Sequence, residues 1–91
     1  MNYKLLITSS YEKKVTKFLK RHPDVFKRYI KTLKILEVNP KHPSLRLHKL
    51  KGNLYEYYSI SINLEYRIII DFIIQNDEII PIDIGTHNEV Y

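Results

Sequence analysis

Residues 55–74 read YEYYSISINLEYRIIIDFII, two apolar runs on either side of the short polar segment Asn63-Leu64-Glu65. In both runs large apolar residues alternate with a second set, and side chains that alternate with a period of two point to opposite faces of a β-strand. One face takes Tyr58, Ile60 and Ile62 from the first run and Tyr66, Ile68, Ile70, Phe72 and Ile74 from the second. The pattern predicts two antiparallel strands with one strongly apolar face.

Strand signals continue on both sides of this pair. Residues 45–50 alternate in the same way, and Gly52-Asn53 supplies a turn before the first run. After the second run, Gln75-Asn76-Asp77 turns the chain into a strand over 78–84. Residues 3–8 predict one more short strand at the N-terminus. The sequence therefore predicts a four-strand meander and a separate N-terminal strand.

Two segments with helical periodicity lie between the N-terminal strand and the meander. Ser9-Ser10-Tyr11-Glu12 matches a capping box, and His22-Pro23-Asp24 ends one helix and begins the next. Apolar residues recur at helical spacing, namely Tyr11, Val15, Phe18 and Leu19 in the first helix and Val25, Phe26, Tyr29, Ile30, Leu33 and Leu36 in the second. We predict one α+β domain over 1–91 in the order β-α-α-β-β-β-β. The helical hairpin packs on one face of a twisted, mainly antiparallel sheet.

The other face of the sheet is expected to stay in contact with water. It carries Tyr57, Ser59, Ser61 and Arg67. Aromatic rings can stack on bases, and an arginine can form paired hydrogen bonds with a phosphate. A chain of this length buries only about 60–65% of its unfolded surface, so an enclosed cavity is not expected. This face is thus a candidate RNA-binding groove.

Composition excludes several classes of protein. There are no cysteines, so disulfide scaffolds, thiolate zinc sites and cysteine nucleophiles are excluded. The densest apolar run, residues 68–74, is interrupted by Asp71 and is too short to span a membrane. The histidines lack metal-ligand spacing, and no glycine-rich phosphate loop occurs. We expect a soluble cytoplasmic protein without a cofactor.

Charge is distributed unevenly along the chain. Residues 1–52 contain 14 Lys and Arg against three acidic residues, whereas residues 53–91 contain one basic residue against seven acidic ones. A strongly basic half indicates a polyanionic partner, of which nucleic acid is the commonest. The alternative is a pair of lysine-rich helix faces that are merely solvated.

Four histidines are candidates for proton transfer near neutral pH. His22 at the helix break and His42 in a proline-flanked loop are typical of surface positions. His48 lies in a basic segment on the first strand of the meander, and His87 follows the last strand. At that exit His87 can either reach over the open face or only cap backbone carbonyls, and its spacing leaves both readings open.

Three short motifs together resemble a known family. They are Leu47-His48-Lys49-Leu50-Lys51-Gly52, Glu65-Tyr66-Arg67-Ile68-Ile69 and Ile82-Asp83-Ile84-Gly85-Thr86-His87, followed by Tyr91 at the end. In this order and spacing the chain resembles the RelE/ParE toxin superfamily. Within it the likeness is to RelE-like and YafQ-like endoribonuclease toxins of type II toxin–antitoxin modules. The resemblance covers essentially the whole chain, because the predicted order of elements is that of the family.

The resemblance implies a ribosome-dependent, metal-independent mRNA endoribonuclease that inhibits translation. A ribose 2′-hydroxyl attacks the adjacent phosphate, which requires a base, an acid and a cation. By position in the motifs, the resemblance implies that His87 is a general acid or base and His48 the second proton-transfer group. Arg67 would clamp the phosphate, while Glu65 and Tyr91 would orient or assist.

The resemblance also implies contacts to RNA. Arg46, Lys49 and Lys51 would grip the RNA backbone, next to Tyr57 and Ser61 on the open face. YafQ-like members commonly carry a histidine where Ser61 stands and an aspartate where Glu65 stands. Because serine cannot carry a proton near pH 7, weak activity or a non-catalytic RNA-binding remnant of the fold is one alternative. A ParE-like toxin that poisons DNA gyrase is another.

The implied partners follow from the same resemblance. We expect mRNA in the A site of the ribosome and a cognate antitoxin, in a toxin–antitoxin complex that is oligomeric. The cationic half of the chain suits an acidic, initially disordered antitoxin. No membrane partner is expected.

Overall fold

Five strands form one mixed sheet in the computed structural model of the chain, which describes residues 2–51, 57–73, 76–86 and 90. The strands are β1 (Lys4–Leu5), β2 (His48–Lys49), β3 (Tyr58–Ser61), β4 (Tyr66–Ile73) and β5 (Glu78–Thr86). Their order across the sheet is β1-β5-β4-β3-β2, with β1 parallel to β5 and every other pair antiparallel. The predicted α+β fold and order of elements are confirmed.

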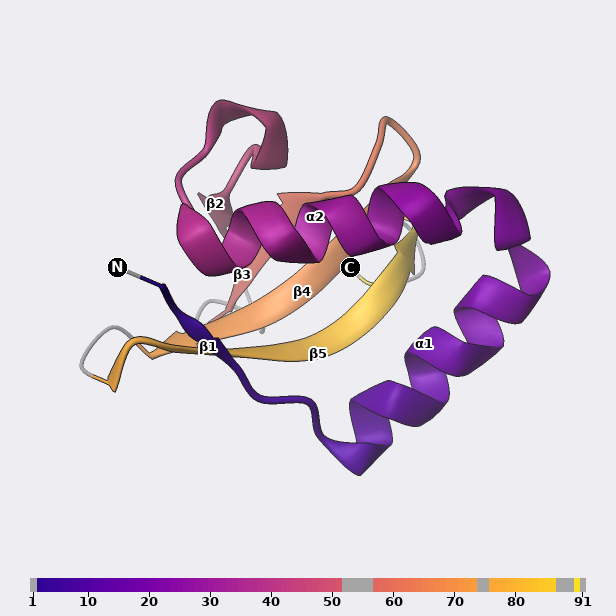
Figure 1. Ribbon diagram of the computed structural model, residues 1–91, viewed down its shortest axis with the longest axis horizontal. Coiled ribbons are helices and arrows are strands. Elements are labelled where there is room, and N and C mark those ends of the chain that lie inside the picture. The colour runs from indigo at the N-terminus through magenta and orange to yellow at the C-terminus, as the bar shows by residue number, and fades with distance from the viewer. Residues whose placement is uncertain (1, 52–56, 74–75, 87–89, 91) are drawn as a thin grey trace.

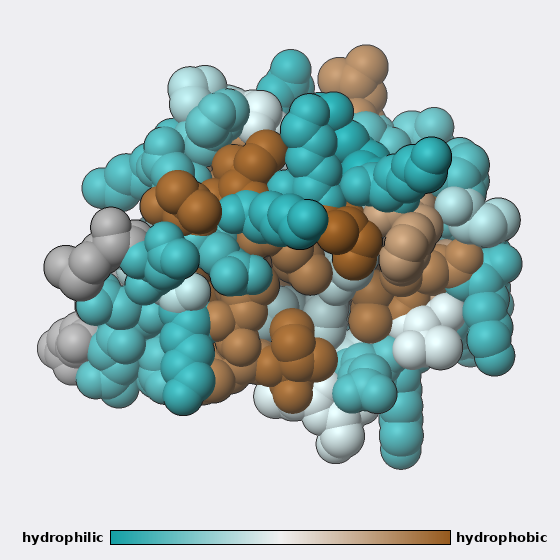
Figure 2. All heavy atoms as spheres, viewed as in Figure 1, coloured by the Kyte–Doolittle hydropathy of each residue, from teal (hydrophilic) through white to brown (hydrophobic). Residues whose placement is uncertain are grey.

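Two helices cover one face of this sheet. They are α1 (Ser9–Arg21) and α2 (Phe26–Val38), joined through the short 3₁₀ helix η1 (Pro23–Val25). Figure 1 shows α2 crossing in front of the strands, with α1 beside the curved strand β5. In the space-filling view, hydrophilic side chains spread over both helices and apolar groups gather between them (Figure 2). Among the described residues, neither helix is long and apolar enough to cross a membrane.

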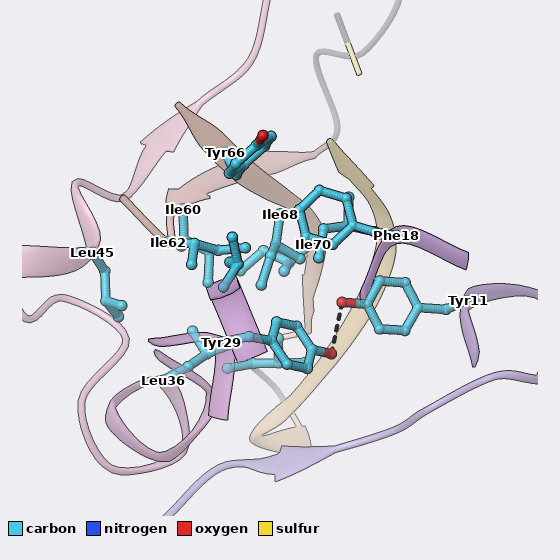
Figure 3. Packing of buried hydrophobic residues seen from close by; sticks show 13 residues of the cluster. Tyr11, Phe18, Tyr29, Leu36, Leu45, Ile60, Ile62, Tyr66, Ile68 and Ile70 are labelled. Atoms are coloured by element: carbon cyan, nitrogen blue, oxygen red, sulfur yellow. Dashed lines mark hydrogen bonds between the residues drawn. The ribbon is translucent and has the colours of Figure 1, made fainter. Parts of the chain in front are cut away.

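The main core lies between the helices and the sheet. It contains Tyr11 and Phe18 of α1, Tyr29 and Leu36 of α2, and the alternate strand residues Ile60, Ile68, Ile70, Ile79 and Ile84. Figure 3 shows the hydroxyls of Tyr11 and Tyr29 pointing toward each other within this core, and their oxygens lie 3.0 Å apart. Burial raises the pKa of both phenols. The alternation seen in the sequence thus selects the face that the helices cover.

An aromatic cluster closes one end of the core. The ring of His22, at the end of α1, lies 4.7 Å from the ring of Phe18 and 4.8 Å from that of Tyr66. Its Nδ1 is 3.2 Å from the Tyr66 hydroxyl. His22 therefore packs on the core, and its assignment to a plain surface position was wrong.

Several element boundaries differ from those expected. The cap of α1 is Thr8, whose Oγ1 accepts the Tyr11 amide hydrogen bond at 3.1 Å, so the helix does not use a capping box at Ser9. Residue Phe26, expected in the core stripe, is half exposed at the first turn of α2. Leu45, expected to begin a strand, instead ends the 3₁₀ helix η2 (Pro43–Leu45). Arg46 follows with a positive φ of 49°, and the strand begins only at His48.

The face away from the helices is drier than the sequence predicted. Ser59 and Ser61 are buried there, and Ile69 packs with Leu50 and Val90 in a second small apolar cluster. Tyr57 and Ile82 pack against the same cluster. Leu50 and Val90 come from segments distant in the sequence. Strand alternation alone therefore could not predict that they cover this face and exclude water from part of it. Only part of this face is available to a ligand.

Candidate functional site

The sheet register brings His48 and Arg67 to the same face, the one away from the helices. His48 lies opposite Ser59, and Ser59 lies opposite Ile69. Arg67 lies opposite Ser61 in the neighbouring row. Directly opposed residues of antiparallel strands share a face, so all of these side chains start from one side. With ordinary strand spacing, the Cα atoms of His48 and Arg67 are about 12 Å apart, close enough for both side chains to approach one phosphodiester.

His48 is oriented by the turn that precedes its strand. Its side chain is exposed, and Nδ1 lies 3.2 Å from the carbonyl oxygen of Arg46. A carbonyl can only accept, so this contact places the hydrogen of a neutral ring on Nδ1. Arg46 itself has a left-handed backbone conformation, with φ 49° and ψ 47°. Nε2 then carries the lone pair, which is the arrangement that a general base requires.

Arg67 has small strand partners on both sides. On β5 it pairs with Gly85, which has no side chain, and on β3 it pairs with Ser61. Among the described residues, the one ion pair joins Lys14 to Asp83 and does not involve Arg67. A half-exposed guanidinium flanked by small residues suits a phosphate, which it can bind with two parallel hydrogen bonds.

Ser59 lies beside His48 in the same cross-strand row and is completely buried. Among the described residues its Oγ has no hydrogen-bond partner, although a buried hydroxyl normally has one. The sequence placed Ser59 on this face but did not mark it as a site residue. Gly85, the β5 partner of Arg67, appeared in a sequence motif but was likewise not predicted as a site residue.

Two predicted site residues hold the turn between β3 and β4. The Ser61 hydroxyl donates to the carbonyl oxygen of Asn63 at 2.6 Å and is buried, so it is engaged within the protein instead of facing RNA. The Asn63 side chain accepts from the amides of Glu65 and Tyr66 at 2.9 and 2.8 Å. Glu65 is exposed in this turn, two positions before Arg67. The turn therefore fixes the start of the strand that carries Arg67.

The predicted RNA-binding cations are not all brought together. Lys49 pairs with Tyr58, whose side chain packs on the core beneath the helices. The register therefore places Lys49 on the helix-covered face of the sheet, and His48 on the other face. Arg46 and Lys51 are exposed before and after this short strand. Tyr57 is half-buried and packs against the second apolar cluster, which contains Ile69.

His87 and Tyr91, both expected in the catalytic group, lie outside the described residues. The structure describes β5 as far as Thr86, which lies opposite Tyr66 and is one position beyond the partner of Arg67. It also describes Val90, which packs with Leu50 and Ile69 on the candidate face. Within the described ranges, no three His, Cys, Asp or Glu residues are grouped in a way that could hold a metal ion.

Comparison with known proteins identifies the family. The family model described as "RelE-like toxin of type II toxin-antitoxin system HigB" matches residues 4–87. The chain therefore belongs to the RelE-like toxins of type II toxin–antitoxin systems, as the resemblance predicted. Among curated protein sequences, no significant match is found.

Solved structures agree with this assignment. The HP0894 protein of Helicobacter pylori, described as a conserved hypothetical protein, is 27% identical over the full length of both chains, with a TM-score of 0.74. A copper-bound mutant toxin from the same organism is also 27% identical over both full chains, with a TM-score of 0.67. In the DinJ–YafQ toxin–antitoxin complex of E. coli, the similar chain is 22% identical and has a TM-score of 0.70. That match covers 100% of this chain and 99% of the other.

Proposed function

We propose that this toxin is an endoribonuclease that cuts mRNA on the ribosome without a metal ion, in the cytoplasm. The observation that carries the proposal is the shared face of His48 and Arg67, which puts a proton-transfer group and a cation on neighbouring rows of one sheet. Cleavage by a ribose 2′-hydroxyl needs these two functions at one phosphodiester. Membership of a toxin family that acts with an antitoxin is consistent with such an activity.

In this mechanism His48 Nε2 takes the proton of the 2′-hydroxyl as the oxygen attacks phosphorus. Arg67 stabilises the additional negative charge on the phosphoryl oxygens. The bond from phosphorus to the 5′-oxygen then breaks, leaving a 2′,3′-cyclic phosphate and a 5′-hydroxyl. We assign to His87 the donation of a proton to that leaving oxygen, and to Glu65 and Tyr91 the orientation of the reacting groups. Arg46 and Lys51, which are exposed before and after β2, would hold the flanking RNA backbone, whereas Lys49 lies on the other face of the sheet and is not assigned to this contact.

Arg67→Ala is the variant that tests the proposal most directly. Loss of one charge-stabilising group is expected to lower the rate of mRNA cleavage by roughly 10²–10³-fold. Cleavage is measured by primer extension on translating ribosomes, with Lys20→Ala as a control because it removes a cation from exposed α1. His48→Ala is expected to lower the rate by roughly 10²–10⁴-fold. Unchanged cleavage in both variants would refute the mechanism, and inhibition of DNA supercoiling without cleavage would favour gyrase as the target.

A non-catalytic RNA-binding role is the second candidate function. It is favoured by Ser61, whose buried hydroxyl is engaged by Asn63 and cannot act as the family histidine would. This role predicts that the wild-type protein binds RNA but leaves mRNA uncut on ribosomes. The same primer-extension experiment distinguishes it from the nuclease.

We also propose a cognate antitoxin as the regulatory partner, in an oligomeric complex. The YafQ chain of similar fold is found in a toxin–antitoxin complex with DinJ. The basic half of the present chain would attract an acidic antitoxin segment electrostatically. Co-purification with the product of an adjacent reading frame, followed by measurement of the mass of the complex, tests this partner.

A further inference from the structure

A separate pocket opens between α2, η2 and the end of β3, with a volume of about 240 Å³. Its polar lining consists of Arg28, Lys31 and Thr32 from α2, His42 and Ser44 at η2, and Ser61 from β3. The lining contains no carboxylate, and neither cation belongs to an ion pair among the described residues. A concave site lined by two cations and no carboxylate has the chemistry of an anion site.

Arg28 is held in place at this pocket. Its Nε donates to the carbonyl oxygen of Ile62 at 2.9 Å, so the guanidinium is fixed against the edge of the sheet. The Thr32 hydroxyl donates to the Arg28 carbonyl oxygen at 2.8 Å and stiffens the same turn of α2. The terminal amino groups of Arg28 make no further hydrogen bond within the described residues. They are therefore available to an anion without the cost of ordering the side chain.

His42, held by Ser44, adds a donor from the opposite wall. The Ser44 amide donates to His42 Nδ1 at 3.1 Å, and the Ser44 hydroxyl lies 2.8 Å from the same nitrogen. Since Nδ1 accepts from a backbone amide, a neutral His42 ring carries its hydrogen on Nε2. The ring can thus donate through Nε2 while Nδ1 caps η2.

We propose that this pocket binds a phosphate of the RNA strand and is a second anchoring point beside the catalytic face. Ser61 connects the two places, because it lines the pocket and lies directly opposite Arg67 across β3 and β4. A strand bound at Arg67 that passes over the β3 edge meets Arg28, Lys31 and His42 next. The identity of the ligand as RNA rests on the proposed function. An antitoxin carboxylate is less favoured because this continuity gives the pocket a specific relation to the catalytic face.

The pocket is tested first with inorganic phosphate, followed by amide chemical shifts in solution. Phosphate is expected to shift the amides of residues 28–32, 42–45 and 61–62. Lys31→Gln should weaken these shifts, whereas Lys34→Gln, which removes the same charge elsewhere on exposed α2, should leave them unchanged. Equal shifts along all lysine-bearing segments would overturn the site.

The assignment to RNA is tested with a single-stranded 2′-O-methyl oligonucleotide, which cannot be cleaved. Lys31→Gln should lower affinity roughly 2- to 5-fold, as expected for one exposed ion pair. It should also reduce the slope of log affinity against log salt by about 0.7, the value for one phosphate of a single strand. Equal affinities for the Lys31→Gln and Lys34→Gln variants would overturn the assignment. Displacement of bound phosphate by an acidic antitoxin peptide but not by the oligonucleotide would do the same.

The experiments can refute the phosphate-anchoring pocket and the nuclease activity independently of each other. The phosphate-induced shifts are expected to persist in Arg67→Ala, because that residue lies on the catalytic face and not in the lining. If wild-type protein bound the oligonucleotide through the pocket but left mRNA intact, the nuclease would be refuted and the anchoring site retained. Normal cleavage with no phosphate shifts at the pocket would refute the anchoring site alone.

Discussion

Ser59 has a buried hydroxyl beside His48 that lacks a hydrogen-bond partner within the part of the chain that the structure describes. Such a group keeps the cost of desolvation without the compensating bond, about 1–3 kcal/mol. A protein retains a cost of this kind more readily where the group has a function, and Ser59 lies in the row that carries the candidate base.

Ser59→Ala is therefore expected to leave the free energy of unfolding unchanged or to raise it by about 1 kcal/mol, because the unpartnered hydroxyl is removed. Urea denaturation measures this, with cleavage on ribosomes measured in parallel. A more stable variant with reduced cleavage would identify Ser59 as a positioning residue for His48. A fall in stability of more than about 1 kcal/mol would show that the hydroxyl has a partner in solution.

At the scale of elements, the N-terminus of α1 has two neighbouring candidates for the N-cap, Thr8 and Ser9. Thr8 accepts from the Tyr11 amide, while Ser9 is the first residue of the helix. Thr8→Ala should lower the free energy of unfolding by about 1 kcal/mol through loss of the cap. Ser9→Ala, the matched control, should change it by no more than a few tenths of a kcal/mol. Thermal or urea unfolding of both variants measures the two losses of stability. A larger loss for Ser9→Ala than for Thr8→Ala would show that Ser9 is the cap, as the capping-box pattern predicted.

The contact between α1 and α2 gives a second prediction at this scale. Tyr11→Phe or Tyr29→Phe alone leaves the other hydroxyl buried without its partner, so each should cost about 1–3 kcal/mol. The double variant should cost less than the sum of the two, because no polar group is left unsatisfied. A double-mutant cycle from urea denaturation measures the coupling. Additive costs would mean that the hydroxyls do not bond to each other.

Strand and helix patterns were predictable because each depends on the period of the side chains. Tyr58, Ile60 and Ile68 were placed on the covered face by alternation, and they pack there. The 3₁₀ turn before Arg46 was not predictable, since a positive φ at an arginine arises from its surroundings and not from its own preference. The strand that carries His48 consequently starts later than its apolar pattern suggested.

At the scale of the whole molecule, the fold separates the two charged halves of the sequence. The basic residues 1–52 form the helices, η2 and the edge strand β2, while the acidic residues 53–91 form the central strands. The candidate site lies where the halves meet, between His48 of one and Arg67 of the other. Its two residues could be found from motifs, but the shared face depends on register. The partial burial of that face depends on Val90, which is distant in the chain. The shared face and its burial therefore could not be predicted from local sequence.

Global stability is also expected to depend on pH in the alkaline range. Burial raises the pKa of Tyr11 and Tyr29 in the folded protein above the ordinary value of about 10. Above pH 10 the unfolded chain loses these protons more readily than the folded protein does, so stability falls as pH rises. The contribution is fully present below pH 10, and the slope is at most about 1.4 kcal/mol per pH unit for each such tyrosine.

Urea denaturation between pH 9 and pH 11 measures this slope. The double variant Tyr11→Phe, Tyr29→Phe has no phenol to ionise at this contact, so its stability should decline less steeply over the same range. The lysines are common to both proteins, so they do not contribute to the difference between the two curves. Parallel curves for the wild type and the double variant would therefore mean that these two hydroxyls reach solvent in the folded protein. Such a result would also mean that no buried hydrogen bond between these two tyrosines joins α1 to α2.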